Sequence, residues 1–176
     1  LRSMLLDNSA KKLVGISWDT INQMNDSSVG LEEFILGIYT PGIRFVCIQY
    51  GEVSDQIKYI REKHGIDICE VEEIDKFNDI DGLASLISAC DEIVTIENLN
   101  KFLGNAVGVN TNMILSKRCW WLFGIDEKRN YWFPFFKLFR QSNFGDWKEP
   151  LEQIKNKIKT SQIYQVYLSE LNLQYY

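Results

Sequence analysis

The sequence predicts an α/β protein: a Rossmann-like, doubly wound parallel sheet of five to six strands with helices on both faces. Short β-rich apolar runs alternate with segments of helical periodicity from residue 13 to about residue 115. The connections between them span only a few residues, and parallel strands need a crossover that a helix supplies. The run 43–50 is nearly all apolar, as expected when both faces of a sheet are covered.

Each element follows from its own stretch of sequence. The expected strands are residues 13–18, 43–50, 66–71, 92–96 and 112–115, with a last short strand at 137–141. The expected helices are residues 31–39, 54–65, 81–90 and 98–107, followed by a closing helix capped by Asp146 or Glu149. Ser54 and Asp81 are the expected N-caps, and Gly65 is the expected stop. We expect the strand order 3-2-1-4-5, with the sixth strand beyond the fifth.

Composition and charge restrict the classes of function. The chain has 176 residues, 45% hydrophobic and 24% charged, which is ordinary for a soluble globular domain. No apolar run approaches the roughly 18–20 residues of a membrane span, and no secretory signal is visible at Leu1. Residues 1–100 carry 18 acidic and 8 basic side chains, against 6 and 11 in residues 101–176. The acidic stretch 67–97 argues against a nucleic-acid-binding surface there.

The cysteines and the single histidine give no support for metal or redox chemistry. Cys47, Cys69, Cys90 and Cys119 show no metal-binding spacing, and we expect them to be reduced, as in a cytoplasmic protein. Cys47 and Cys69 should be buried in separate strands. His64 is expected at the surface, at a helix end. The sequence therefore predicts no metal, no cofactor and no disulfide.

Candidate site residues are found by position in the fold. The dinucleotide fingerprint, the P-loop and the hydrolase elbow are all missing from the sequence. In a doubly wound sheet, however, ligands bind beyond the carboxyl ends of the strands. The strand at 92–96 runs directly into a helix, whose free N–H groups and dipole favour an anion. Glu97 at this turn could accept a hydrogen bond from a ligand hydroxyl, or it could serve only as a helix cap.

Aromatic residues are concentrated after Ser116. The run CWWLFGIDEKRNYWFPFFKLFRQ holds Trp120, Trp121, Trp132 and five phenylalanines. We expect these side chains to fill the core and to cover an edge of the sheet.

Five segments, taken in order, carry a resemblance to a known family: VGISW, PGIRFVCIQYG, DIDGLASLISACDEIVTI, FLGNAVGV and YWFPFFKLFRQ…GDW. From Leu13 to about Ile158 the chain resembles the C-terminal half of the GT-B-type glycosyltransferase-like domains of bacterial tetratricopeptide-repeat proteins. Heptosyltransferases and O-GlcNAc transferases are distant relatives of that family. The resemblance implies an interdomain connection ending in residues 1–10, a nucleotide-sugar-binding domain at 11–160 and a helical tail at 161–176.

The resemblance also implies a set of substrate-binding residues. The family motif has an Asp-Thr or Asp-Asn pair, then three residues, then His-Leu-Ala-Gly-Ala. Glu97 and Asn98 stand at the pair, Phe102 stands at the histidine, and Asp19 stands where the family often has a basic residue. Lys101 and Lys117 are candidates for contacting the diphosphate. The implied substrate-binding set is Ser17, Trp18, Gln49, Tyr50, Gly51, Glu97, Asn98, Leu99, Lys101 and Lys117.

Two functions are compatible with these residues. In the first, the chain binds a nucleotide-diphosphate sugar weakly, and an N-terminal domain outside this chain holds the acceptor and supplies the catalytic base. In the second, the loss of the histidine and the presence of Asp19 mark a degenerate module that binds proteins beside tetratricopeptide repeats. In either case we expect no catalytic residue here and no transferase activity from this chain alone. We also expect Trp18, Gln49, Tyr50, Asn98 and Lys117 to line one solvent-open cleft, with Phe102 in the core or the cleft floor.

Overall fold

The protein was analysed as a computed structural model that describes residues 1–6, 12–21, 27–124 and 130–170, with side chains described as far as residue 163. The helices are α1 (Arg2–Leu5), α2 (Leu31–Ile38), α3 (Ser54–His64), α4 (Ile80–Ser88), α5 (Asn100–Ala106), the 3₁₀ turn η2 (Trp121–Phe123) and α6 (Lys148–Glu170). The strands are β1 (Lys12–Ser17), β2 (Ile43–Cys47), β3 (Ile68–Cys69), β4 (Glu92–Thr95), β5 (Asn110–Leu115) and β6 (Phe136–Arg140).

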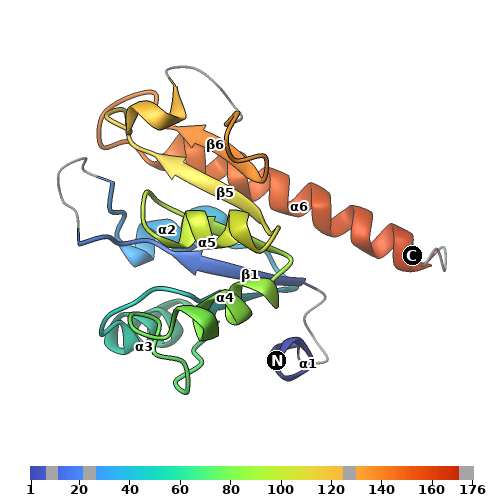
Figure 1. Cartoon of the computed structure of the whole chain (residues 1–176). Helices are drawn as coiled ribbons and strands as arrows, with labels where there is room; N and C mark the ends of the chain where they lie inside the picture. Colours follow the sequence, from blue (N-terminus) through green and yellow to red (C-terminus); the bar gives the residue numbers. More distant parts are fainter. Residues whose placement is uncertain (7–11, 22–26, 125–129, 171–176) are drawn as a thin grey trace.

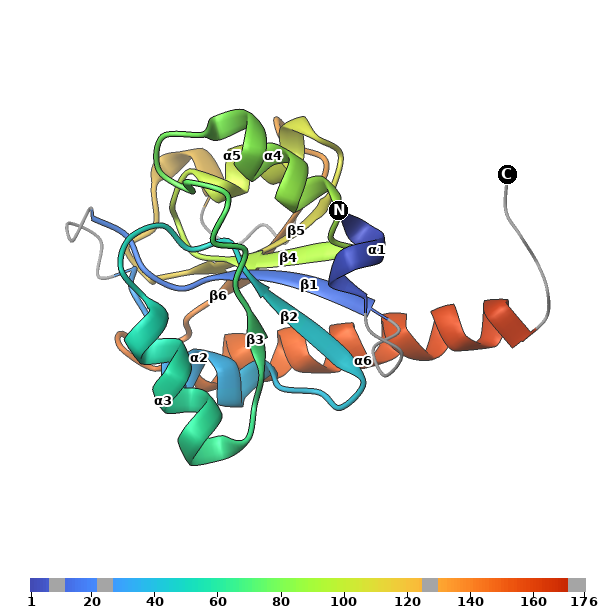
Figure 2. The same cartoon turned by 90° about the horizontal axis from the view of Figure 1, so that it is seen from below.

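The strands form one parallel sheet in the order β3-β2-β1-β4-β5-β6. This confirms the expected order, including the place of the sixth strand. Figure 1 shows the sheet with its helices, and Figure 2 shows α4 and α5 on one face and α2, α3 and α6 on the other. The order reverses between β1 and β4, so the carboxyl ends of these strands mark the switch point at which such folds bind ligands.

The alternation of side chains along each strand divides the core in two. One apolar layer joins Val14 and Ile16 to α2, α3 and α6, and includes Phe34, Ile154 and Ile158. A second layer joins the other faces of β1, β2 and β4 to α4. Gly37 allows α2 to pack closely against α6, because a Cβ at this position would lie 2.8 Å from the side chain of Leu151. A larger side chain at position 37 would therefore push α2 and α6 apart.

Several local expectations are corrected by the structure. Val53, not Ser54, is the N-cap of α3, because the Ser54 hydroxyl donates to Glu70 instead. Asp79, not Asp81, caps α4 by accepting from the Gly82 N–H at 2.8 Å. Gly65 ends α3 in the left-handed conformation (φ 66°), as expected.

The four cysteines are unpaired. Cys47 is buried in β2, and burial raises the pKa of its thiol to about 11. Cys69 in β3 is only partly buried, contrary to expectation, because β3 is a two-residue strand at the edge of the sheet. Burial likewise raises the pKa of Cys90 to about 12. His64 ends α3, where its Nε2 lies 2.7 Å from a carboxylate oxygen of Glu32.

The two ends of the described chain pack differently. The short helix α1 lies against the domain, with Leu5 in the α4 layer and Arg2 paired with Asp91 at 2.8 Å. The proposed interdomain role of residues 1–10 remains a prediction, and residues 7–10 lie outside the described part. Helix α6 continues unbroken across the expected boundary at residue 161 as far as Glu170, and residues 171–176 are not described. None of the described helices is long and apolar enough to cross a bilayer.

Candidate functional site at the carboxyl edge of the sheet

A buried hydrogen-bond network ties together the carboxyl ends of β1 and β4. The Asn98 amide donates to the Ser17 hydroxyl at 2.9 Å and accepts from the Thr95 hydroxyl at 2.9 Å. The same amide oxygen accepts from the N–H of Asn100, the first residue of α5, at 3.1 Å, although the N-cap of this helix is Leu99. Because Ser17 and Thr95 also bond to each other at 2.7 Å, the three side chains form a closed ring.

At the end of β2, Gln49 makes a similar set of hydrogen bonds to the loop that follows β1. Its side-chain oxygen accepts from the backbone N–H groups of Trp18 and Asp19, each at 3.0 Å. Its amide donates to the carbonyl of Tyr50, whose hydroxyl accepts from the N–H of Ile21 at 3.0 Å. These bonds fix the loop that leaves β1 and satisfy polar groups that would otherwise be costly to bury.

The expected solvent-open cleft is therefore not formed by these residues. Trp18, Gln49 and Asn98 are only 1%, 2% and 5% exposed, because their polar atoms are paired within the protein. Tyr50 is half-buried, whereas Gly51 and Leu99 are exposed on the loops nearby. Phe102 is partly buried against Phe133, with ring centroids 5.2 Å apart, so its expected place in the core is confirmed. The expectation that the set binds substrate stays a prediction.

Several N–H groups at the start of α5, which we expected to be free for an anion, are already hydrogen-bonded within the chain. This helix has only seven residues, and the N–H groups of Asn100, Phe102 and Leu103 already have acceptors within the chain. Glu97 does not cap it, because the Glu97 carboxylate accepts from the N–H of Trp120 at 3.1 Å and from Ser27 at 3.4 Å. Burial raises the pKa of Glu97, although these donors and nearby cations act in the opposite direction.

Lys101 is a cation held in an apolar setting beside Glu97. It is buried, its ammonium donates to the carbonyl of Asn98 at 3.0 Å, and it lies 4.5 Å from the centroid of the Phe102 ring. Burial lowers the pKa of Lys101 to about 8, and the charge of Glu97 only partly offsets that effect. A buried ammonium of this kind cannot reach a solvent-borne diphosphate without a rearrangement.

The Lys101 ammonium predicts a specific pH dependence. Because its folded pKa lies near 8 and its unfolded value near 10.5, the unfolded chain binds more protons between these values, so stability should rise with pH across that window. We expect a rise of about 1–3 kcal/mol. Urea unfolding from pH 7.5 to 10.5 measures it, with Lys101→Met as the comparison. An equally steep rise in Lys101→Met would show that other groups are responsible.

A cavity opens beside the Asn98 network, at the carboxyl ends of β5 and β6. Its volume is about 620 Å³, and its lining residues are Ser116, Lys117, Cys119, Trp121, Gly124, Arg140, Gln141 and Ser142. Lys117 belongs to the set predicted from the sequence; Arg140, Gln141 and Ser142 were missed. The signal was present, since KLFRQ was an expected strand and its carboxyl end should have been included in the same strand-end argument.

Two donors in this cavity have no acceptor among the described residues. Gln141 is 5% exposed; its amide oxygen accepts from the Lys117 N–H at 3.2 Å, but its Nε2 has no partner. Arg140 donates to Cys119 Sγ at 2.7 Å and to the carbonyl of Phe123, whereas its Nε has no partner. Buried unpaired donors are uncommon in folded proteins. These two nitrogens are buried behind the lining, whereas the charges of Lys117 and Arg140 make the cavity itself suited to an anion.

The aromatic segment fills part of the core beside the edge strand β6, as expected, but two of its tryptophans stay exposed. Phe123 and Phe136 are buried in a third apolar cluster with Met113. Trp121 and Trp132, in contrast, are 77% and 76% exposed. The indole of Trp121 therefore borders the cavity as an open aromatic surface.

Comparison with known proteins agrees with this architecture. No protein-family model matches the chain. Two solved structures are similar: the glycosyl transferase family 9 protein from Veillonella parvula (TM-score 0.56, 11% identity) and E. coli heptosyltransferase WaaC with ADP (TM-score 0.55, 12% identity). The fold is glycosyltransferase-like. The similarity covers 94% and 93% of this chain, but only 49% and 47% of those two chains, and at these identities it concerns the fold alone.

A curated relative comes from sequence comparison. Protein FlbA of Caulobacter vibrioides is 26% identical over 149 residues, which make up 83% of this chain and 25% of FlbA. The chain thus spans about a quarter of this relative and about half of the two glycosyltransferase structures.

Proposed function

We propose that this chain is the donor-binding half of a glycosyltransferase-like protein. It binds a nucleotide-diphosphate sugar at the carboxyl edge of the sheet, and a domain outside this chain holds the acceptor. The fold supports this proposal, since both similar structures are glycosyltransferases and the heptosyltransferase was solved with ADP. The tetratricopeptide-repeat context and the assignment to a C-terminal half rest on the sequence resemblance.

The proposal rests on the cavity at the carboxyl ends of β5 and β6. The donor diphosphate is placed against Lys117 and Arg140, because charged donors bind phosphate oxygens more strongly than neutral ones do. The exposed face of Trp121 lies beside them and can stack against the base or the sugar ring. In this assignment Lys117 keeps its predicted role, whereas Lys101 is buried and does not line the cavity.

The chemistry available in the cavity is binding rather than proton transfer. Its described lining residues include cations, hydroxyls, an amide and a thiol, but neither a carboxylate nor a histidine. Deprotonating an acceptor hydroxyl needs such a base within hydrogen-bond reach. The chain by itself is therefore inactive in this proposal, and the base comes from the acceptor side.

A protein-interaction module is the second candidate, and two observations favour it. Asp19 stands at the switch point, where its carboxylate accepts from Thr20 and Ser28 and would repel a diphosphate. Trp121, Tyr131 and Trp132 are largely exposed, and aromatic residues of this kind are enriched at protein interfaces. In this reading the aromatic segment contacts the neighbouring repeats.

Calorimetric titration with uridine, guanosine and adenosine diphosphates tests the proposal. We expect a dissociation constant of about 1 mM for the preferred nucleotide. Lys117→Met should weaken that binding about tenfold through loss of one charge-assisted hydrogen bond. Lys159→Met, an exposed change on α6, is the matched control and should leave binding unchanged.

Thiol labelling reports whether the nucleotide enters this cavity. Cys119 is a partly exposed lining residue, whereas Cys47 and Cys90 are buried with raised pKa values. In a Cys69→Ser background, the nucleotide should slow labelling of Cys119. Binding without protection of Cys119 would place the nucleotide elsewhere. Failure of the full-length protein to bind any of the three nucleotides would favour the interaction module.

A further inference from the structure

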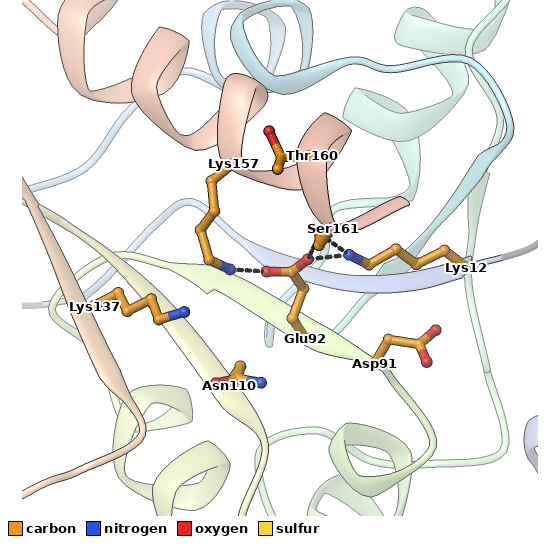
Figure 3. A pocket seen from close by; sticks show the side chains of 8 residues that line it. All are labelled: Lys12, Asp91, Glu92, Asn110, Lys137, Lys157, Thr160 and Ser161. Carbon is orange, nitrogen blue, oxygen red and sulfur yellow. Dashed lines mark hydrogen bonds and ion pairs between the residues drawn. The ribbon is translucent and has the colours of Figure 1, made fainter. Parts of the chain in front are cut away.

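A second cavity lies at the opposite, amino-terminal edge of the sheet. Its volume is about 490 Å³, and four strands and the last helix contribute its lining: Lys12, Asp91, Glu92, Asn110, Lys137, Lys157, Thr160 and Ser161. Figure 3 shows Lys12, Lys137 and Lys157 approaching Glu92 from three elements.

Strand register explains why these charged side chains meet. Glu92 on β4 is paired with Asn110 on β5 and with Val14 on β1, and paired residues in a parallel sheet share a face. Lys12 lies two residues before Val14 and therefore projects to that same face. Lys137 on β6 is paired with Asn112, which lies two residues after Asn110. All four strands thus direct polar side chains toward α6, which adds Lys157 and Ser161.

Both carboxylates of the cavity are already occupied. Glu92 is 2% exposed, and its two oxygens accept from the ammonium groups of Lys12 and Lys157. The amide of Asn112 adds a third donor at 2.6 Å. Asp91 is bound by Arg2 at 2.8 Å and by the backbone N–H of Leu13 at 2.8 Å. Neither carboxylate is left to bind a cation, and the described residues contain no metal-binding group of three ligands.

The ammonium groups, in contrast, retain unused donors. Each carries three N–H bonds. Lys157 donates only to Glu92, and Lys137 makes no hydrogen bond or ion pair with any described residue. Three lysines therefore share the cavity with Glu92, because the second carboxylate, Asp91, is paired with Arg2. Burial lowers the pKa of Lys157, although the charge and hydrogen bond of Glu92 act in the opposite direction.

We propose that this cavity binds a phosphate-class oxyanion between Lys137, Lys157 and Lys12. The Asn110 amide lies beside Lys137 at the rim and supplies a neutral donor. Lys12 is buried and Lys157 is partly buried, so their attraction to an anion is screened less by water than that of the exposed Lys137, which supplies the ammonium with no partner among the described residues. The volume exceeds that of inorganic phosphate, so the phosphoryl group of a small metabolite also fits.

Calorimetric titration of the protein with inorganic phosphate and, separately, with glycerol 3-phosphate tests this site. We expect saturable binding of at least one of them. Tighter binding of glycerol 3-phosphate would identify a phosphorylated metabolite as the ligand type, and equal or tighter binding of inorganic phosphate would identify the free ion. Lys137→Met should weaken it about tenfold. Asn110→Asp, which adds a carboxylate at the rim, should also weaken it.

Controls separate this cavity from the one at the carboxyl edge. Lys159→Met removes an exposed lysine from the same helix and should leave phosphate binding unchanged. Lys137 is exposed and unpaired among the described residues, so Lys137→Met should keep the unfolding midpoint of the parent protein. Loss of phosphate binding in Lys117→Met but not in Lys137→Met would place the anion at the carboxyl edge and overturn the inference. Lack of any saturable binding at millimolar phosphate would do the same, whatever the nucleotide titrations give.

Discussion

Glu92→Gln should lower the free energy of unfolding by about 3–5 kcal/mol, because it removes the one carboxylate shared by two buried ammonium groups. The glutamine oxygen still accepts a hydrogen bond, but the charges of Lys12 and Lys157 are then uncompensated. Urea denaturation of both proteins at neutral pH measures the change. A loss below about 1 kcal/mol would mean that water already solvates these lysines.

A triple variant separates the cost of unpaired charge from the value of the network. Replacement of a buried ionic cluster by apolar residues is often neutral or stabilising. Lys12→Met, Glu92→Leu and Lys157→Met made together should therefore recover most of the stability that Glu92→Gln loses. If the triple variant were as unstable as Glu92→Gln, packing rather than charge would explain the loss.

Acid titration of the unmodified protein examines the same group. Burial alone would raise the pKa of Glu92, but the charges and hydrogen bonds of Lys157 and Lys12 outweigh it and lower the pKa to about 2. The folded value lies below the unfolded value of 4.5, so the stability from Glu92 is present above pH 4.5. It should be lost as the pH falls from 4.5 toward 2, and the triple variant should lack this component.

Asn98→Ala should cost about 2–4 kcal/mol of unfolding free energy. It removes the acceptor of the Asn100 N–H at the start of α5 and opens the ring formed with Ser17 and Thr95. Thermal and urea denaturation measure the loss, with the exposed Asn156→Ala on α6 as a control expected to change stability by less than about 0.5 kcal/mol. If the two variants were equally stable, the Asn98 side chain would be free for ligands, as the sequence alone had suggested.

The arrangement of the sheet was predictable because it depends on short-range patterns. Apolar runs such as 43–50 and helical stripes such as Leu151, Ile154 and Ile158 alternate along the chain, and parallel pairing then allows few strand orders. The exact caps were harder to predict. Asp79 and Asp81 are both good caps by residue type, and only the geometry of the preceding turn selects Asp79.

The candidate sites were less predictable because they depend on contacts between distant residues. Nothing near Gln49 in the sequence shows that its side-chain oxygen will accept hydrogen bonds from the N–H groups of Trp18 and Asp19. Glu92 was read as part of an ordinary strand, since its lysine partners lie 80 and 65 residues away. The exposure of Trp121 was also invisible, because composition predicts burial for tryptophan in general.

The order in which a ribosome makes the chain gives the position of α6, after all six described strands, a further consequence. Lys12 on β1 bonds to Ser161 on α6, which is 149 residues later. At about 5–20 residues per second, synthesis of that interval takes about 7–30 s. During this time the apolar layer between the sheet and its helices lacks Ile154 and Ile158, which α6 supplies. Apolar side chains of this layer therefore stay accessible to other proteins until α6 emerges.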